Sequence, residues 1–124
     1  MRTRPYLYKQ IVATLFNCSA NLLDEKLILK TTLTAIKKAH MILAKTKTAN
    51  PLVYRIASDI MGGGVSVSAL ITTSHLMVHT SKLHRSVEFD CATCGENSDP
   101  EAALETFKKM LKPKFVMIQY RTKF

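Results

Sequence analysis

The sequence predicts an α+β fold, a two-layer sandwich with one mainly antiparallel sheet and two helices packed on one of its faces. Three observations predict it. Two segments have helical periodicity, several short segments are rich in branched and aromatic residues, and two of those short segments follow each other as a hairpin. The 124 residues suffice for one hydrophobic core, so we expect a single domain over residues 1–124.

The first third of the chain supplies a strand and a helix. Residues 10–17 are rich in branched and aromatic side chains, which is typical of a strand. Asp24 precedes a helical stretch that runs to about residue 40, with apolar side chains at spacings of four and three on one face: Leu29, Leu33 and Ile36. Residues 41–44 suggest a second strand, and residues 45–59 carry only weak signals.

The middle of the chain predicts a hairpin and one more strand. Three glycines at residues 62–64 break the chain and allow a tight entry into a strand. Apolar and small polar residues then alternate over residues 65–71, a polar turn follows at residues 72–73, and residues 74–80 form the returning strand. Residues 86–91 are the next strand candidate.

The last third has the best-marked helix. Asp99 can cap it, Pro100 suits its first position and Pro113 stops it. Its apolar stripe consists of Leu104, Phe107 and Leu111. Residues 115–120 form a closing strand. With both helices on one face, the other sheet face stays free, and we expect a homodimer through that face or through a sheet edge.

Composition narrows the class of protein and its partners. Apolar residues make up 47% and charged residues 22%, which is typical of a globular chain, and no apolar run is long enough to span a membrane. The first residues contain no apolar core like that of a secretory signal, so we expect a cytoplasmic protein. The net charge is +9, but the basic residues are spread singly and do not alternate with aromatic ones, so we expect no nucleic-acid partner.

Two histidines and two cysteines fall in a short window. His75 and His79, followed by Cys91 and Cys94, have a spacing like that of a zinc site. In a strand, however, residues four apart are separated by about 13 Å. A redox Cys-x-x-Cys normally begins a helix, and none is expected here. We therefore expect no metal, a buried Cys91, and an open question about the function of Cys94.

The same region resembles a known family. The segments that carry the resemblance are Gly64-Val65-Ser66, Ser74-His75-Leu76-Met77-Val78-His79-Thr80, Asp90 and Cys94-Gly95. They are similar to the prokaryotic S-adenosylmethionine decarboxylases, whose hallmark is Glu-Ser-His-Leu-Thr-Ile-His-Thr-Trp-Pro-Glu, followed by an Asp-containing strand and Thr-Cys-Gly. The first strand and the last helix also resemble the family, so the likeness covers nearly the whole chain except about residues 40–60.

The resemblance implies a self-processing enzyme. The hydroxyl of Ser74 would attack the carbonyl of Thr73, and the chain would split between these two residues. Ser74 would become a covalent pyruvoyl group, the cofactor that forms a Schiff base with an amino-acid-type substrate and accepts the electrons left by CO2. The family assigns a hydrogen-bonding role in processing to the position of Ser66, proton acceptance to that of His79 and proton donation in decarboxylation to that of Cys94. Its dimer shares the active site between subunits.

Departures from the family concern the substrate. Thr73 replaces the Glu before the cleaved bond, where only a carbonyl is required. Ser81, Lys82 and Leu83 replace Trp-Pro-Glu, whose aromatic ring stacks on adenine and whose acid binds the ribose. A second stacking aromatic falls at about Ile60. The processing residues therefore match the family and the nucleoside-binding residues do not.

Several functions stay open on this basis. The first is an S-adenosylmethionine decarboxylase of spermidine biosynthesis that holds its nucleoside differently. The second is a pyruvoyl-dependent arginine or ornithine decarboxylase, in which Glu88 or Asp90 would bind the distal charge of a cationic substrate. The third is a non-catalytic relative that binds partners or dimerises, and the last is an unrelated zinc or nucleic-acid module. Together, Ser66, Ser74, His79 and Cys94 favour an enzyme.

Overall fold

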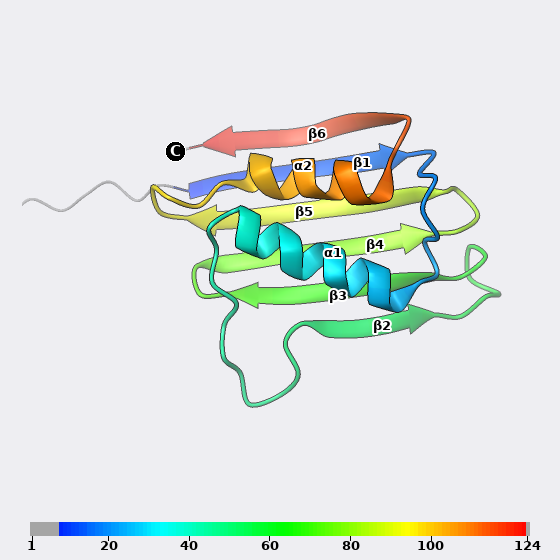
Figure 1. Ribbon diagram of the computed structural model, residues 1–124, viewed down its shortest axis with the longest axis horizontal. Coiled ribbons are helices and arrows are strands. Elements are labelled where there is room, and N and C mark those ends of the chain that lie inside the picture. The colour runs from blue at the N-terminus through cyan, green and yellow to red at the C-terminus, as the bar shows by residue number, and fades with distance from the viewer. Residues whose placement is uncertain (1–7, 124) are drawn as a thin grey trace, which may run out of the picture.

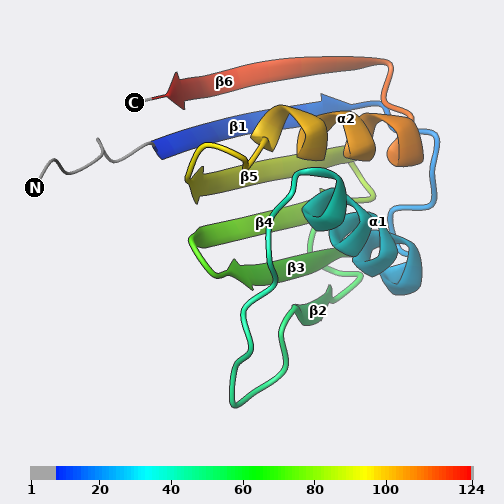
Figure 2. The ribbon, with the colours of Figure 1, turned by 60° about the vertical axis from the view of Figure 1, so that its left-hand side comes forward.

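Six strands form one antiparallel sheet with a covered and an open face in the computed structural model, which describes residues 8–123. Both helices lie on the covered face (Figure 1), and the rotated view in Figure 2 shows them on the same side of the sheet. The expected α+β sandwich is confirmed. In chain order the elements are β1 (Tyr8–Phe16), α1 (Glu25–Lys38), β2 (Leu52–Ile56), β3 (Gly64–Ile71), β4 (Ser74–Ser81), β5 (Ser86–Cys94), α2 (Pro100–Leu111) and β6 (Phe115–Lys123).

The strand order is β2-β3-β4-β5-β1-β6. The hairpins β2-β3, β3-β4 and β4-β5 follow one another along the chain, and β1 then lies between β5 and β6. The predicted hairpin with a turn at residues 72–73 is confirmed. The predicted strand over residues 86–91 extends to Cys94, so that this cysteine lies in the sheet.

Local capping explains where both helices begin. The side chain of Asp24 accepts a hydrogen bond from the backbone N–H of Leu27 over 3.1 Å, and that of Asp99 accepts one from Ala102 over 3.2 Å. Each bond satisfies a donor that the first helical turn leaves free. Lys112 ends α2 in the left-handed conformation, at φ 53°, one residue before Pro113. The predicted capping of the last helix is confirmed.

The apolar face predicted for α1 is wrong in part. Leu33 is 41% exposed, whereas Thr31 and Thr32 are fully buried. Their hydroxyls donate to the carbonyl oxygens of Leu27 and Ile28 one turn earlier, over 2.7 and 2.8 Å. Because these bonds satisfy the hydroxyl groups inside the helix, threonine can face the core at low cost. In α2 the stripe of Leu104, Phe107 and Leu111 is buried as predicted.

The predicted strand over residues 41–44 is also wrong. This segment makes a single bridge between Leu43 and Ile71, and its apolar character comes from Met41, which packs into the core. The strand of this region is β2, which the sequence signals did not locate. It is an edge strand in which Leu52 and Tyr54 are exposed, so it lacks the burial pattern that marks an inner strand.

A close backbone contact explains one of the three glycines. A Cβ atom on Gly64 would overlap the carbonyl oxygen of Thr80 on the neighbouring strand. The two preceding glycines have φ of 74° and 88°, which side-chain-bearing residues rarely adopt. The three glycines therefore allow the backbone before β3 to lie close against the end of β4.

None of the helices within the described part of the chain is long and apolar enough to cross a membrane.

Candidate functional site

The peptide bond between Thr73 and Ser74 lies at the tip of the β3-β4 hairpin. The thiol of Cys94 at the end of β5 donates a hydrogen bond to the carbonyl oxygen of Thr73 over 3.3 Å. The hydroxyls of Thr73 and Thr93 are hydrogen-bonded over 2.9 Å, which holds the turn against β5. Ser74 is half-buried and opens β4. Three of the residues singled out from the sequence, Thr73, Ser74 and Cys94, are thus brought together.

A second pair lies in the middle of the open face. Ser66 on β3 and His79 on β4 are directly opposite each other, and Ser66 Oγ lies 2.6 Å from His79 Nδ1. This short hydrogen bond fixes the imidazole plane on the face that the helices leave uncovered. Two residues singled out separately from the sequence, Ser66 and His79, are thus in contact, and their roles in processing stay predictions.

The two groups are separate within one chain. Ser74 and His79 are five positions apart on β4, which is about 16 Å along an extended strand. At that distance the imidazole does not contact the Thr73–Ser74 bond of its own chain. The candidate residues therefore form two separate groups on one sheet: one at the hairpin tip and one around Ser66 and His79.

The two acidic candidates have different surroundings. Glu88 lies opposite His79 on the open face, is exposed, and has no ion-pair partner among the described residues. Asp90 lies farther along β5, where its Oδ1 accepts a hydrogen bond from Gln10 over 3.0 Å and lies 3.3 Å from Nε2 of His75. Asp90 is thus engaged with protein groups, and Glu88 is free to meet a ligand.

A hollow of about 720 Å³ lies beside His79 and Glu88. Sequence reasoning missed most of its lining, because the contributing residues come from five separate segments and share no local motif: Thr14, Phe16, Ile56, Met61, Ser81, His84 and Gln119 are among them. Ser81 lies in the wall where the family has an aromatic residue. Leu83 and Ile60 are 66% and 54% exposed and are not part of the wall.

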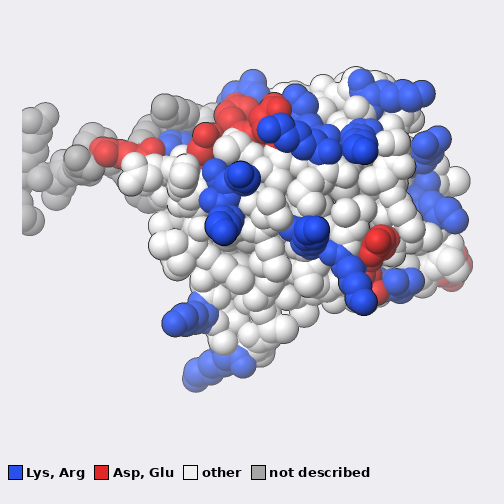
Figure 3. All heavy atoms as spheres, in the orientation of Figure 1, with Lys and Arg blue, Asp and Glu red and all other residues white. Residues whose placement is uncertain are grey.

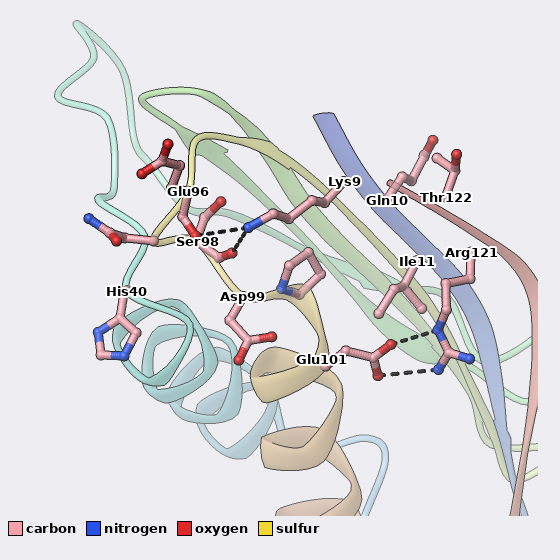
Figure 4. A pocket seen from close by; sticks show the side chains of 12 residues that line it. Lys9, Gln10, Ile11, His40, Glu96, Ser98, Asp99, Glu101, Arg121 and Thr122 are labelled. Carbon is pink, nitrogen blue, oxygen red and sulfur yellow. Dashed lines mark hydrogen bonds and ion pairs between the residues drawn. The ribbon is translucent and has the colours of Figure 1, made fainter. Parts of the chain in front are cut away.

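A second hollow, of about 370 Å³, contains none of the predicted site residues (Figure 4). It lies next to the loop that follows Cys94. Lys9 Nζ donates to the carbonyl oxygens of Glu96 and Ser98 over 3.1 and 2.6 Å, and Arg121 forms an ion pair with Glu101. The two bonds from Lys9 thus hold the loop after Cys94 against β1, and the ion pair holds the start of α2 against β6.

Ionisation of the buried thiols is suppressed. Burial raises the pKa of Cys91 to about 12 and that of Cys18 to about 11. The predicted burial of Cys91 is confirmed, since its side chain is 0% exposed. Partial burial, with the nearby Asp90 carboxylate, also raises the pKa of Tyr8. Of the three cysteines, Cys94 is the one with an accessible side chain.

Across residues 8–123 no group of three or more His, Cys, Asp and Glu side chains is arranged to hold a metal ion. Figure 3 shows Lys and Arg scattered over the helix-covered face rather than gathered in one patch. Three ion pairs, Arg55–Glu25, Lys108–Glu105 and Arg121–Glu101, involve some of these residues. The expectation of no nucleic-acid partner stays a prediction.

Comparison with known proteins places this geometry in a family. The family model for S-adenosylmethionine decarboxylase matches residues 9–123. The chain belongs to the S-adenosylmethionine decarboxylase family. It is 30% identical to the S-adenosylmethionine decarboxylase proenzyme of Pyrobaculum arsenaticum over 114 residues, covering 90% of this chain and 84% of that protein. For the proenzyme of Pyrobaculum neutrophilum the identity is 32% over 110 residues, covering 87% of this chain and 82% of that protein.

A solved structure shares the fold. The adenosylmethionine decarboxylase of Aquifex aeolicus superposes with a TM-score of 0.74 at 23% identity, covering 95% of this chain and 88% of that chain. The family resemblance inferred from the motifs around Ser74 and Cys94 is therefore confirmed. The roles of the individual residues in this decarboxylase family member stay predictions.

Proposed function

We propose that this chain is a self-processing S-adenosylmethionine decarboxylase proenzyme, which cleaves itself between Thr73 and Ser74 and serves polyamine biosynthesis, the role that the family name implies. The observation that carries the proposal is the 3.3 Å hydrogen bond from the Cys94 thiol to the Thr73 carbonyl oxygen. It puts a donor on the one carbonyl that the cleavage chemistry needs.

The cleavage uses groups of the chain itself. The Ser74 hydroxyl oxygen attacks the Thr73 carbonyl carbon, the Ser74 nitrogen takes up a proton and leaves, and an ester replaces the peptide bond. During the attack the carbonyl oxygen gains negative charge, which the Cys94 thiol stabilises through its hydrogen bond. A base then removes the Ser74 α-proton, the Thr73 carboxylate leaves, and addition of water with loss of ammonia produces a ketone at residue 74.

The residues around this position fit a pyruvoyl group. Once formed, that group supplies an electron sink for the departure of CO2. The half-exposed Cys94 holds a proton beside it, in reach of a carbon that has lost its carboxylate. Cys91, buried and hardly ionised, is not suited to this role.

A homodimer through the open sheet face would complete the site. The base predicted at His79 lies about 16 Å along β4 from Ser74 in the same chain. We therefore expect the His79 imidazole of a second copy to act as the base. The open face carries apolar side chains suited to such contact, among them Leu52, Tyr54 and Leu70, which are 60%, 63% and 52% exposed. In this arrangement Thr73, Ser74 and Cys94 of one chain meet Ser66 and His79 of the other.

Intact mass spectrometry of the purified protein tests the proposal. The expected result is two fragments, residues 1–73 and 74–124, the second lighter by one ammonia than a fragment that begins with serine. The variant Ser74→Ala stays in one piece. Release of CO2 from S-adenosylmethionine by the cleaved protein completes the test. A chain that stays uncleaved for days at several pH values contradicts the proposal and favours a non-catalytic relative.

A second candidate is a decarboxylase of a smaller cationic amino acid. The carboxylate of Glu88, which no described residue pairs with, lies beside the 720 Å³ hollow and supports it. So do Ser81 and Leu83, at positions where the family binds a nucleoside. A carboxylate recognises a distal ammonium or guanidinium group. CO2 release from arginine or ornithine, without release from S-adenosylmethionine, would favour this alternative.

A further inference from the structure

Five polar side chains form a cluster on the open face next to the Thr73–Ser74 bond, and neither proposed half of the site includes most of them. The tyrosine hydroxyl of Tyr8 donates to Gln10 over 2.8 Å, and the Gln10 amide donates to Asp90 over 3.0 Å. His75 Nε2 lies 3.3 Å from the same Asp90 oxygen. The fifth member, Cys94, is opposite Tyr8 in the pairing of β1 with β5.

The His75 imidazole has one shielded nitrogen. Its Nε2 is buried from solvent and makes no hydrogen bond of good geometry with a described group. The 3.3 Å approach of Asp90 Oδ1 is within ion-pair distance, although the ring is not aligned for a hydrogen bond. An unpaired buried N–H is costly, so a small rotation toward Asp90 is favourable. A carboxylate on this side favours the Nε2–H tautomer and leaves Nδ1 to exchange protons.

The sheet register places His75 between the acid and the thiol. His75 is paired with Ala92 on β5. Asp90 and Cys94 are two positions before and after Ala92, on the same face of the sheet. Such diagonal neighbours are about 7–8 Å apart, which is within reach of a histidine side chain. His75 is also the residue directly after Ser74.

We propose that Asp90 and His75 form a proton relay that recharges Cys94. This proposal rests on the function proposed above, in which Cys94 donates a proton to the substrate carbon. The thiol then becomes a thiolate, and the His75 imidazolium returns a proton to it from Nδ1. The neutral imidazole next takes a proton from solvent, to which its side chain is 31% exposed, while Asp90 holds the Nε2–H. Each turnover thus transfers one proton from solvent to the product. Asp90 acts as a positioning residue.

Among the described residues, the groups that face His75 from neighbouring strands can be named. Its partner on β3 is Leu70, which has no charge. The phenol of Tyr8 on β1 lies close to Asp90 on β5 and to Tyr120 on β6. Burial raises the pKa of Tyr8, so its phenol stays protonated at neutral pH.

Two measurements test the relay. The first is ¹⁵N NMR of histidine side chains in the uncleaved Ser74→Ala protein, in which His75→Asn assigns the signal. We expect the His75 imidazole to carry its proton on Nε2 in this protein. When Asp90→Asn is added, we expect a mixture of the two tautomers instead. The second is the pH profile of CO2 release by cleaved wild-type and variant enzymes. We expect His75→Asn and Asp90→Asn to lower kcat about tenfold or more, with little change in KM, and Asp90→Glu to recover part of it.

Matched controls are available in the chain. His40→Asn changes an exposed histidine at φ 57°, a conformation that asparagine tolerates, and Asp59→Asn removes an exposed acid. Both should behave like wild type. A free tautomer mixture in the Ser74→Ala protein, or unchanged kcat and pH profile in both test variants, overturns the relay alone. A wild-type chain that never cleaves overturns the proposed function as well, so the two failures are distinguishable.

Discussion

The Sγ atom of Cys94 lies 3.3 Å from the carbonyl oxygen of Thr73 and donates a hydrogen bond to it. The contact joins the end of β5 to the tip of the β3-β4 hairpin, two places that are 21 residues apart in the sequence. It connects the thiol expected to act in decarboxylation with the bond expected to break in processing.

Loss of this thiol should slow self-cleavage. Cys94→Ala removes the hydrogen bond to the oxygen that becomes negatively charged, so we expect cleavage to slow about tenfold, equivalent to about 1.4 kcal/mol of barrier. Cys94→Ser keeps a donor and should cleave faster than the alanine variant. Intact mass spectra taken over time give both rates. Equal rates for wild type and Cys94→Ala would remove the thiol from the processing step.

Mixing two inactive proenzymes should restore cleavage. Ser74→Ala lacks the nucleophile and His79→Ala lacks the base, but a mixed dimer has one complete site if the two chains share it. In a statistical mixture about half of the dimers are mixed, so about half of the His79→Ala chains should be cleaved after coexpression. Mass spectrometry distinguishes the two chains. No cleavage in a mixture that forms dimers would place the site within a single chain.

Glu88 should affect substrate binding and not processing. Its carboxylate has no ion-pair partner among the described residues and lies in the wall of the 720 Å³ hollow. We expect Glu88→Gln to raise KM about tenfold with little change in kcat, because a charge-assisted hydrogen bond to the substrate is lost. Glu105→Gln, on the helix-covered face, is the control. Unchanged KM for every active substrate would exclude Glu88 from binding.

Ionisation of the Cys91 thiol should lower the free energy of unfolding at alkaline pH. Its pKa is raised from 9.0 to about 12 in the folded chain, so unfolded molecules ionise this thiol at lower pH than folded ones. The stabilisation of the folded chain by the neutral Cys91 thiol is therefore complete below pH 9. It is lost between pH 9 and about 12, where the free energy of unfolding falls by up to about 1.4 kcal/mol per pH unit. Thermal unfolding at several pH values should show a steeper alkaline decline for wild type than for Cys91→Ala. Parallel declines would contradict the assignment.

Alkylation gives an independent check on the same thiols. At neutral pH iodoacetamide should modify Cys94 first, since Cys18 and Cys91 are buried and hardly ionised. Peptide mapping after brief treatment identifies the modified residue.

Local signals in the sequence determined much of this fold. The alternating residues of β3 and β4 and the Asp99-Pro100 start of α2 act within a few neighbours, so they can be interpreted without the rest of the chain. The exposed edge strand β2 and the buried Thr31 and Thr32 could not be predicted in this way. Their placement depends on which surfaces the tertiary fold covers, and the helix itself satisfies the threonine hydroxyls.

The same distinction applies to the candidate site. The residues around Ser74 and Cys94 were identified from sequence because a motif preserves residue types and spacing. Only the tertiary structure decided that Ser66 lies opposite His79, and that Asp90 lies against His75. Both facts follow from strand register, which hydrogen bonds between distant segments establish. The spacing of residues along the sequence does not contain that information.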